Sequence, residues 1–143
     1  MLPEAMELVI VTPTRQLVRA RPLEVTLPGA NGYLGILPGH APLMTELGIG
    51  ELTYRSATPT EPLLIIRGFA EVLPDRVTVL AETAELAAEI DLERAQAAKA
   101  RAEKRLAAGD PNIDWDRAGV ALQRALIRIQ VAGKYRGTPA NSR

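Results

Sequence analysis

The residue composition changes abruptly after Ile90, and this change limits the folds that the chain can adopt. Residues 1–90 consist of short apolar segments that are rich in Val, Ile and Leu and separated by Pro and Gly. Residues 91–108 contain neither Pro nor Gly and are rich in Ala, Arg, Lys and Glu. Because Pro and Gly interrupt helices and short apolar segments between turns favour strands, the sequence predicts a β half followed by an α half.

The six-residue motif that begins the α half occurs twice in the sequence. Ile-Asp-Leu-Glu-Arg-Ala at residues 90–95 recurs as Ile-Asp-Trp-Asp-Arg-Ala at residues 113–118. In each copy an aspartate, Asp91 or Asp114, stands where a helix N-cap belongs, and an acidic residue follows in the first turn. The repeat therefore predicts that two helices begin at matching signals.

The two helices are expected over about residues 91–107 and 114–132, because a Gly-Asp-Pro sequence separates them. Their short connection favours an antiparallel hairpin. Apolar residues at three- and four-residue steps predict the face that each helix presents to the other. They are Ala95, Ala98, Ala102 and Leu106 in the first helix, and Trp115, Ala118, Leu122, Ala125, Ile129 and Ala132 in the second. Because alanine buries little apolar area, we expect a hairpin that is helical but weakly docked.

The β half is expected to contain short strands at regular spacing, which favours a sandwich or a flattened barrel. Alternation of apolar and polar residues at 23–27 and 77–80 predicts one buried and one solvent-facing side. The expected strands cover residues 6–11, 16–19, 23–27, 33–37, 52–55, 63–66, 70–73 and 76–81. Between them, the Gly- and Pro-rich residues 32–43 are interpreted as a packed β-corner.

Several classes of site are not supported by the composition. The chain has no cysteine, so neither a disulfide framework nor a thiolate zinc site is expected. His40 is the one histidine of the chain. The sequence offers it no partner nucleophile, so we expect no catalytic residue, and it offers too few further ligands for a metal, so we expect no metal site. The apolar runs are too short to span a membrane and the first residues do not form a signal peptide, which predicts a soluble intracellular protein.

Positive charge is concentrated in the α half. Residues 1–90 carry eleven acidic and six basic side chains, whereas residues 91–143 carry six acidic and eleven basic ones. Arginines recur at steps of seven and four along one face of each helix. They are Arg94, Arg101 and Arg105 in the first helix, and Arg117, Arg124 and Arg128 in the second. In an antiparallel hairpin both rows fall on one side, and the guanidinium groups of Arg94, Arg101, Arg124 and Arg128 would gather within roughly 10 Å.

The two rows of arginines leave several interpretations open. They can form a solvated basic face, or they can bind an anion of polyphosphate size. A basic hairpin that binds nucleic acid or another polyanion is a third interpretation, although the helices lack a row of exposed aromatic residues. A metabolic enzyme is the least supported, because the sequence has no paired acid and base groups and no phosphate-binding glycine loop.

Four motifs, in order, resemble one known family. They are Gly-Ile-Leu-Pro-Gly-His-Ala-Pro-Leu at 35–43, Gly-Phe-Ala-Glu-Val at 68–72, Val-Thr-Val-Leu-Ala at 77–81 and the hexamer at 90–95. Together with the hairpin they resemble the epsilon subunit of the bacterial F-type ATP synthase over about residues 6–135. Two positions depart from the family pattern: Arg67 stands where a glycine is common before Gly68, and Tyr33 replaces an acidic residue.

The resemblance implies a β + α fold: a flattened β-sandwich of about ten strands in residues 1–86, an antiparallel two-helix hairpin in 87–137 and a disordered tail in 138–143. It implies a non-catalytic rotor subunit of the central stalk that couples the gamma subunit to the c ring in proton-driven ATP synthesis. His40 matches a ring-facing histidine. The extended hairpin would inhibit ATP hydrolysis by contacting the beta subunit. Such a protein lies at the cytoplasmic face of the bacterial inner membrane, reaches the membrane only through the complex and binds no nucleic acid.

The resemblance also implies a regulatory ATP site, although no cofactor is required. In some bacterial members the folded hairpin binds ATP through an Ile/Leu-Asp-x-x-Arg-Ala motif, which here consists of Ile90, Asp91, Arg94 and Ala95. By family position the nucleotide would also meet Glu85, Arg101, Arg124 and Arg128. Asp91 then has two competing roles, as a helix cap and as a nucleotide contact.

Overall fold

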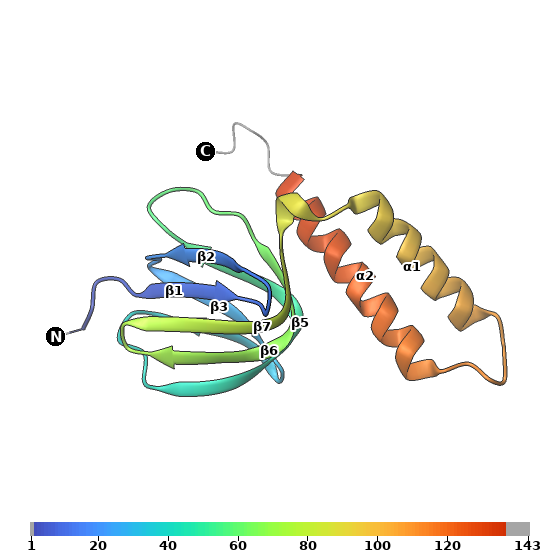
Figure 1. Ribbon diagram of the computed structural model, residues 1–143, viewed down its shortest axis with the longest axis horizontal. Helices are drawn as coiled ribbons and strands as arrows, with labels where there is room; N and C mark the ends of the chain where they lie inside the picture. Colours follow the sequence, from blue (N-terminus) through green and yellow to red (C-terminus); the bar gives the residue numbers. More distant parts are fainter. Residues whose placement is uncertain (1, 137–143) are drawn as a thin grey trace. The chain divides into compact units, whose positions relative to one another are not determined.

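The computed structural model describes residues 2–136 of the chain. The chain divides after Leu86 into two compact units, which we call the β unit and the hairpin unit. Figure 1 shows the strands in the first and two antiparallel helices in the second. The change of composition after Ile90 therefore lies close to the boundary between the two units.

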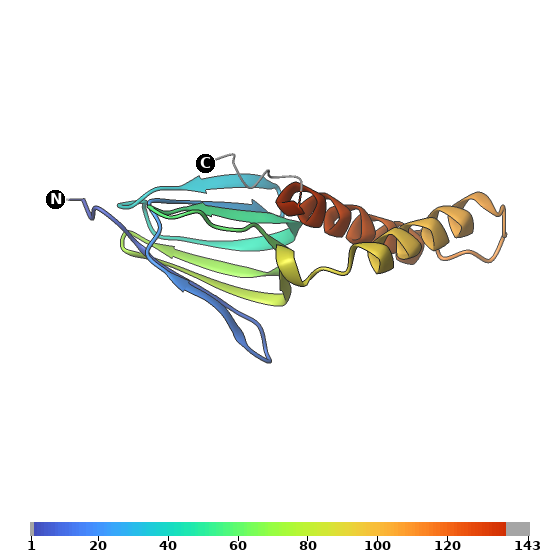
Figure 2. The same ribbon diagram turned by 90° about the horizontal axis from the view of Figure 1, so that it is seen from above.

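One hydrogen-bonded sheet forms the β unit. Its strands are β1 (Glu7–Val11), β2 (Gln16–Ala20), β3 (Glu24–Gly29), β4 (Gly32–Ile36), β5 (Leu43–Arg55), β6 (Leu63–Leu73) and β7 (Arg76–Leu86). They lie in the order β2-β1-β7-β6-β5-β3-β4. Strands β1 and β7 are parallel and the other neighbours are antiparallel. The sheet folds over on itself into the two layers visible in Figure 2, which is the predicted sandwich.

The long strands bend at one line across the sheet, which we call the crease. In β6, Ile66 and Gly68 pair with both neighbouring strands, but Arg67 between them pairs with neither. Arg67 has φ 59° and Gly68 has φ 131°, both in the region that favours glycine. A Cβ on Gly68 would lie 2.1 Å from the carbonyl oxygen of Leu80, so only glycine fits there. Arg67 stands where the family commonly has a glycine, and β6 is nevertheless continuous at this position. The arginine is held there in a strained backbone conformation.

The expected count of about ten strands is corrected to seven within the described residues. Strands β5, β6 and β7 run through the crease without interruption. The predicted strands 63–66 and 70–73 are the two halves of β6, and the predicted strand 52–55 is only the end of β5. Gly48 and Gly50, which belong to the glycines and prolines that separate short apolar segments in the sequence, lie inside β5. Glycine is common both at a bend within a paired strand and at a turn between two strands. The sequence alone therefore does not show which of the two a glycine marks.

Large apolar side chains from both layers fill the core of the β unit. Alternation holds as predicted in β3, where Val25 and Leu27 are fully buried and Glu24 and Thr26 are half-buried. The fully buried large residues of this core include Met6, Leu8, Ile10, Leu27, Ile36, Leu52, Leu63 and Ile65.

The hairpin unit contains a 3-10 turn, η1 (Ala87–Glu89), and the helices α1 (Leu92–Ala107) and α2 (Trp115–Arg136). Both predicted caps are present, because Asp91 accepts a hydrogen bond from the Arg94 amide at 3.0 Å and Asp114 accepts one from the Arg117 amide at 3.0 Å. Helix α2 continues past the predicted end near residue 132 because Gly133 stays helical. The predicted tail at 138–143 lies outside the described residues.

Alanines line the contact between α1 and α2. The buried residues that follow the predicted stripes are Ala95 and Ala102 in α1 and Ala118, Ala125 and Ala132 in α2. The placement of Trp115 on this stripe was wrong, because its side chain is 61% exposed. Trp115 lies three residues before Ala118, which rotates it about 60° away from the buried line.

Candidate functional site

The arginines of the hairpin unit lie on one face, which we call the arginine face (Arg94, Arg101, Arg105, Arg117, Arg124 and Arg128). Four of them directly precede a buried alanine of the seam: Arg94 before Ala95, Arg101 before Ala102, Arg117 before Ala118 and Arg124 before Ala125. One helical step is a rotation of about 100°, so each arginine is turned by the same angle in the same sense from the seam. For two antiparallel helices this places both rows on the same side, as the sequence predicted.

The guanidinium groups differ in their surroundings. Arg94 and Arg101 are exposed and make no ion pair with another described residue. Arg124 is half-buried, and its Nε is buried without a hydrogen-bond partner among the residues described. Arg128 is half-buried and takes part in an interaction of its own. Because an unpaired buried donor costs about 1–3 kcal/mol, the Nε of Arg124 is the one group here that lacks an acceptor it needs.

Of the remaining residues of the expected nucleotide site, all but Glu85 lie at the start of α1 and play structural roles there. Ile90 and Ala95 are buried within the hairpin unit, where η1 packs against α2. The carboxylate of Asp91 caps α1, as described above, and the side chain is exposed. Glu85 lies in β7 of the β unit and is half-buried. The hairpin unit therefore carries all of the expected residues except Glu85.

His40 lies in a loop that hydrogen bonds hold in place. Its Nδ1 is 2.6 Å from the carbonyl oxygen of Ala41, and because a carbonyl can only accept, Nδ1 carries the proton. The amide of Gly39 donates to the carbonyl of Pro74 at 2.7 Å, which joins this loop to the turn between β6 and β7. His40 is half-buried and Leu37 is 56% exposed. The loop is a fixed structure with an apolar side chain on its surface.

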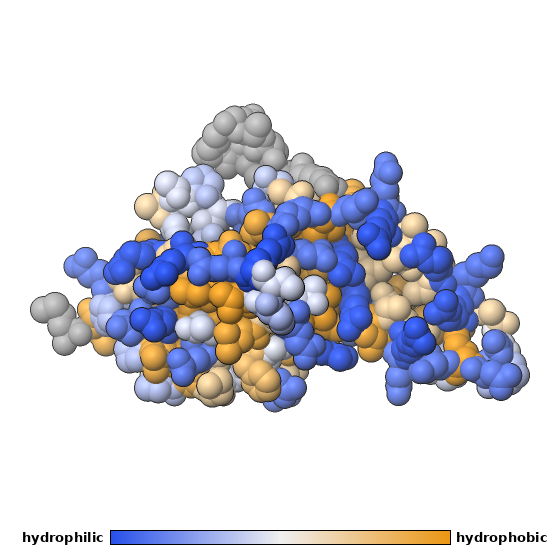
Figure 3. All heavy atoms as spheres, in the orientation of Figure 1, coloured by the Kyte–Doolittle hydropathy of each residue, from blue (hydrophilic) through white to orange (hydrophobic). Residues whose placement is uncertain are grey.

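Sequence reasoning missed an exposed apolar surface on the outer side of β1, β7, β6 and β5. We call it the apolar face (Val11, Met44, Phe69 and Leu80). Leu80 pairs with Val11 on one side and with Phe69 on the other, so the three form a row across the sheet. Met44 is 63% exposed, and Phe69 and Leu80 are each 54% exposed. In Figure 3 apolar side chains gather over the front of the β unit with hydrophilic ones around them.

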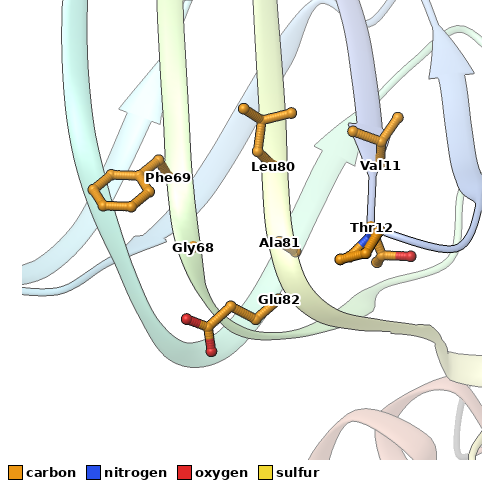
Figure 4. A pocket seen from close by; sticks show the side chains of 8 residues that line it. Val11, Thr12, Gly68, Phe69, Leu80, Ala81 and Glu82 are labelled. Atoms are coloured by element: carbon orange, nitrogen blue, oxygen red, sulfur yellow. The ribbon is translucent and has the colours of Figure 1, made fainter.

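A hollow lies at the crease beside this face. It has a volume of about 360 Å³, and Val11, Pro13, Phe69, Leu80 and Glu82 are among the residues that line it. Figure 4 shows the side chains of Phe69 on β6 and Leu80 on β7, and the carboxylate of Glu82 close to Gly68. The signal that could have revealed the face is that Phe69 and Leu80 are apolar although their neighbours Ala70 and Val79 already fill the buried positions.

Other kinds of site find no support in residues 2–136. Within this part of the chain no three His, Asp or Glu side chains are grouped so that they could hold a metal ion. None of its helices is both long and apolar enough to cross a membrane.

Comparison with known families gives a match to each unit. Residues 5–87 match the family model described as "ATP synthase, Delta/Epsilon chain, beta-sandwich domain". Residues 88–133 match the model described as "ATP synthase, Delta/Epsilon chain, long alpha-helix domain".

Individual relatives extend over most of the chain. The "ATP synthase epsilon chain" of Koribacter versatilis is 55% identical over 108 residues, which cover 76% of each chain. The protein with the same description in Syntrophobacter fumaroxidans is 46% identical over 131 residues, covering 92% of this chain and 98% of the relative. A chain in the cryo-EM structure of the Euglena gracilis mitochondrial ATP synthase has a TM-score of 0.77 at 22% identity, covering 88% of this chain and 80% of that one, and shares the fold.

Proposed function

This chain belongs to the delta/epsilon family of ATP synthase chains, and from that premise we propose a role for each of its two units. It is an epsilon chain, a non-catalytic subunit of the central stalk of the F-type ATP synthase. The observation that carries this assignment is the family match, which continues from residue 5 to residue 133 through both units. The comparisons give no support to the alternative of a nucleic-acid or polyanion-binding module.

For the β unit the proposed role is to couple the gamma subunit to the c ring during proton-driven ATP synthesis. Its apolar face exposes Met44, Phe69 and Leu80 beside polar residues, as surfaces that bind other proteins do, and it is assigned to gamma. The loop around His40 is assigned to the c ring, because hydrogen bonds hold the loop in place and Leu37 is exposed on it. The subunit would then be a peripheral protein at the cytoplasmic face of the bacterial inner membrane, held there through the complex.

For the hairpin unit the proposed role is to regulate ATP hydrolysis by moving between two states. In the extended state the arginine face would meet an acidic segment of the catalytic beta subunit. In the compact state the same arginines would hold ATP. A ligand shifts such an equilibrium only by the difference between its affinities for the two states. ATP must therefore bind the compact state more tightly than the extended state, and the beta subunit must do the reverse.

The described residues fit a bound ATP at the arginine face. Arg94 and Arg101 have no ion-pair partner among the described residues, and the Nε of Arg124 lacks an acceptor that a phosphate oxygen would provide. Asp91 would act mainly by capping α1, since its carboxylate already accepts the amide of Arg94. ATP would be held as a regulatory ligand without being hydrolysed.

Removal of the hairpin tests the regulatory role. In the assembled synthase, a chain that ends at residue 90 should raise the rate of ATP hydrolysis while proton-driven synthesis continues. Hydrolysis at the unchanged rate would contradict the regulatory role and leave the role of the β unit standing.

Titration of the isolated chain with ATP tests the nucleotide site. Calorimetry and the fluorescence of Trp115 should show saturable binding that Arg94→Ala abolishes. Lys99→Ala is the matched control, because it removes one positive charge from α1 at a position about 140° around the helix from Arg94 and about 160° from Arg101. If the wild type bound no ATP up to millimolar concentration, residues 90–95 would be only a helix start.

A further inference from the structure

Three exposed glutamates lie near Phe69 on neighbouring positions of the sheet, and we call them the acidic rim (Glu46, Glu71 and Glu82). Glu46 on β5 is the direct cross-strand partner of Phe69. Glu71 follows Phe69 by two residues on β6, so both side chains lie on the same side of the sheet. Glu82 follows Leu80 by two residues on β7, and Leu80 is the partner of Phe69 on that side. All three glutamates are exposed, so each can reach a ligand above the ring.

No ion pair within residues 2–136 balances the charge of the acidic rim. None of its three carboxylates forms an ion pair with another described residue, and the exposed Arg67 at the crease forms none either. Glu7 in β1 behaves differently, because its carboxylate lies 3.7 Å from Arg19 and 4.0 Å from Arg76. Three like charges around one ring repel each other weakly, and a cation placed among them removes that repulsion.

We propose that the apolar face recognises an arginine or lysine side chain of the gamma subunit, placed over the ring of Phe69 and within reach of the acidic rim. This inference rests on the proposed function, which assigns the face to gamma. An aromatic ring attracts a cation that lies over it within about 6 Å, and carboxylates hold a guanidinium by paired hydrogen bonds. The hollow of about 360 Å³, bordered by Phe69, Leu80 and Glu82, provides apolar walls for the methylene stem and a carboxylate for the charged end.

Charge complementarity favours a segment of gamma that carries an arginine or lysine over a segment that is purely apolar. An apolar segment alone would cover the acidic rim and remove its carboxylates from water without pairing them, which is unfavourable. A segment that combines apolar residues with one arginine or lysine contacts Leu80 and Met44 and neutralises the rim at the same time. The c ring is assigned to the His40 loop, so gamma is the partner that this face would meet.

The test measures the affinity of the full-length chain for the purified gamma subunit of the same synthase at several salt concentrations. In the triple variant Glu46→Gln, Glu71→Gln, Glu82→Gln, we expect affinity to fall about tenfold or more and its dependence on salt to largely disappear. Phe69→Leu should weaken binding about three- to thirtyfold because it removes the ring while keeping apolar area, whereas Phe69→Tyr should bind like the wild type. Thermal unfolding of each variant checks that these exposed substitutions leave the fold intact.

Glu24→Gln is the control, because it removes a carboxylate from β3 that is paired with Arg55 at 3.2 Å. It should leave the affinity unchanged. If the triple variant bound gamma as tightly as the wild type, or if Glu24→Gln weakened binding as much, the inference would be overturned and the proposed function would stand. If the wild type did not bind gamma at all, both would fall.

Discussion

The β unit and the hairpin unit hold their elements together by different means. In the β unit, fully buried side chains such as Leu8, Leu27 and Ile65 come from both layers of the sheet. In the hairpin unit, the seam between α1 and α2 is formed by alanines such as Ala102 and Ala125. Fully burying a leucine or isoleucine side chain stabilises the folded state by about 1.5–3 kcal/mol. An alanine buries only one methyl group, and a group of that size contributes about 0.8 kcal/mol. The difference indicates that the two helices of the hairpin unit bury less apolar area against each other than the two layers of the β unit do.

Substitution of Gly68 in the β unit and of Gly109 in the hairpin unit, two of the glycines with positive φ, should show the largest difference between the units. Gly68→Ala places a Cβ 2.1 Å from the carbonyl oxygen of Leu80 and should lower the free energy of unfolding of the β unit by about 3 kcal/mol or more. Gly109→Ala is the matched change in the hairpin unit, where φ is 69° and the space is open, and should cost only about 1 kcal/mol. Urea unfolding followed by circular dichroism measures both.

Equal losses for Gly68→Ala and Gly109→Ala would contradict the view that the crease is tightly packed and the hairpin turn is not. Arg67→Gly extends the same test. It should leave stability unchanged or raise it slightly, because glycine adopts φ 59° without the strain that arginine bears there.

The two helix caps should give a smaller and more informative effect. Asp91→Ala and Asp114→Ala each remove a 3.0 Å hydrogen bond to a helix amide, and each should lower helix stability by about 1 kcal/mol. Amide hydrogen exchange in α1 and α2 measures the two losses separately.

Binding of ATP then separates the structural role of Asp91 from a functional one. If both substitutions weaken ATP binding to the same extent, Asp91 acts only by holding the hairpin together. If Asp91→Ala weakens it far more than Asp114→Ala, the first copy of the motif has a role that the second lacks.

The smallest expected effect is the titration of Tyr54 in the β unit. Burial, and secondarily the charge of Glu61, raise the pKa of the Tyr54 hydroxyl above its usual value near 10. The folded state therefore holds this proton more tightly than the unfolded state does. The resulting stabilisation is fully present below pH 10 and is lost as the pH rises through the raised pKa.

Unfolding of the wild type and of Tyr54→Phe at several alkaline pH values measures this contribution. The wild type should lose more stability than Tyr54→Phe between pH 10 and the raised pKa. Identical profiles would show that the Tyr54 hydroxyl is as well solvated as in the unfolded chain. Glu61→Gln should shift the wild-type profile toward lower pH.

Local interactions made much of the hairpin unit predictable. Asp91 and Asp114 cap helices through contacts to residues three positions away, and such contacts depend on sequence neighbours alone. The arginine face followed from the helical repeat for the same reason. Trp115 was misplaced because its exposure depends on where the partner helix lies, and a three-residue spacing allows either outcome.

The sequence by itself determined the change from strands to helices, the helix starts and the alternation of buried residues within strands, because all of these follow from short-range periodicity and capping. Only the tertiary structure decided that β5, β6 and β7 run unbroken through the crease, that Arg67 adopts a positive φ, and that Phe69 faces solvent between Glu46, Glu71 and Glu82. These features depend on how three consecutive strands pair and bend together in the folded sheet. Glycine and bulky residues at these positions suit either a bend within a paired strand or a turn between two strands, and only the completed sheet distinguishes the two.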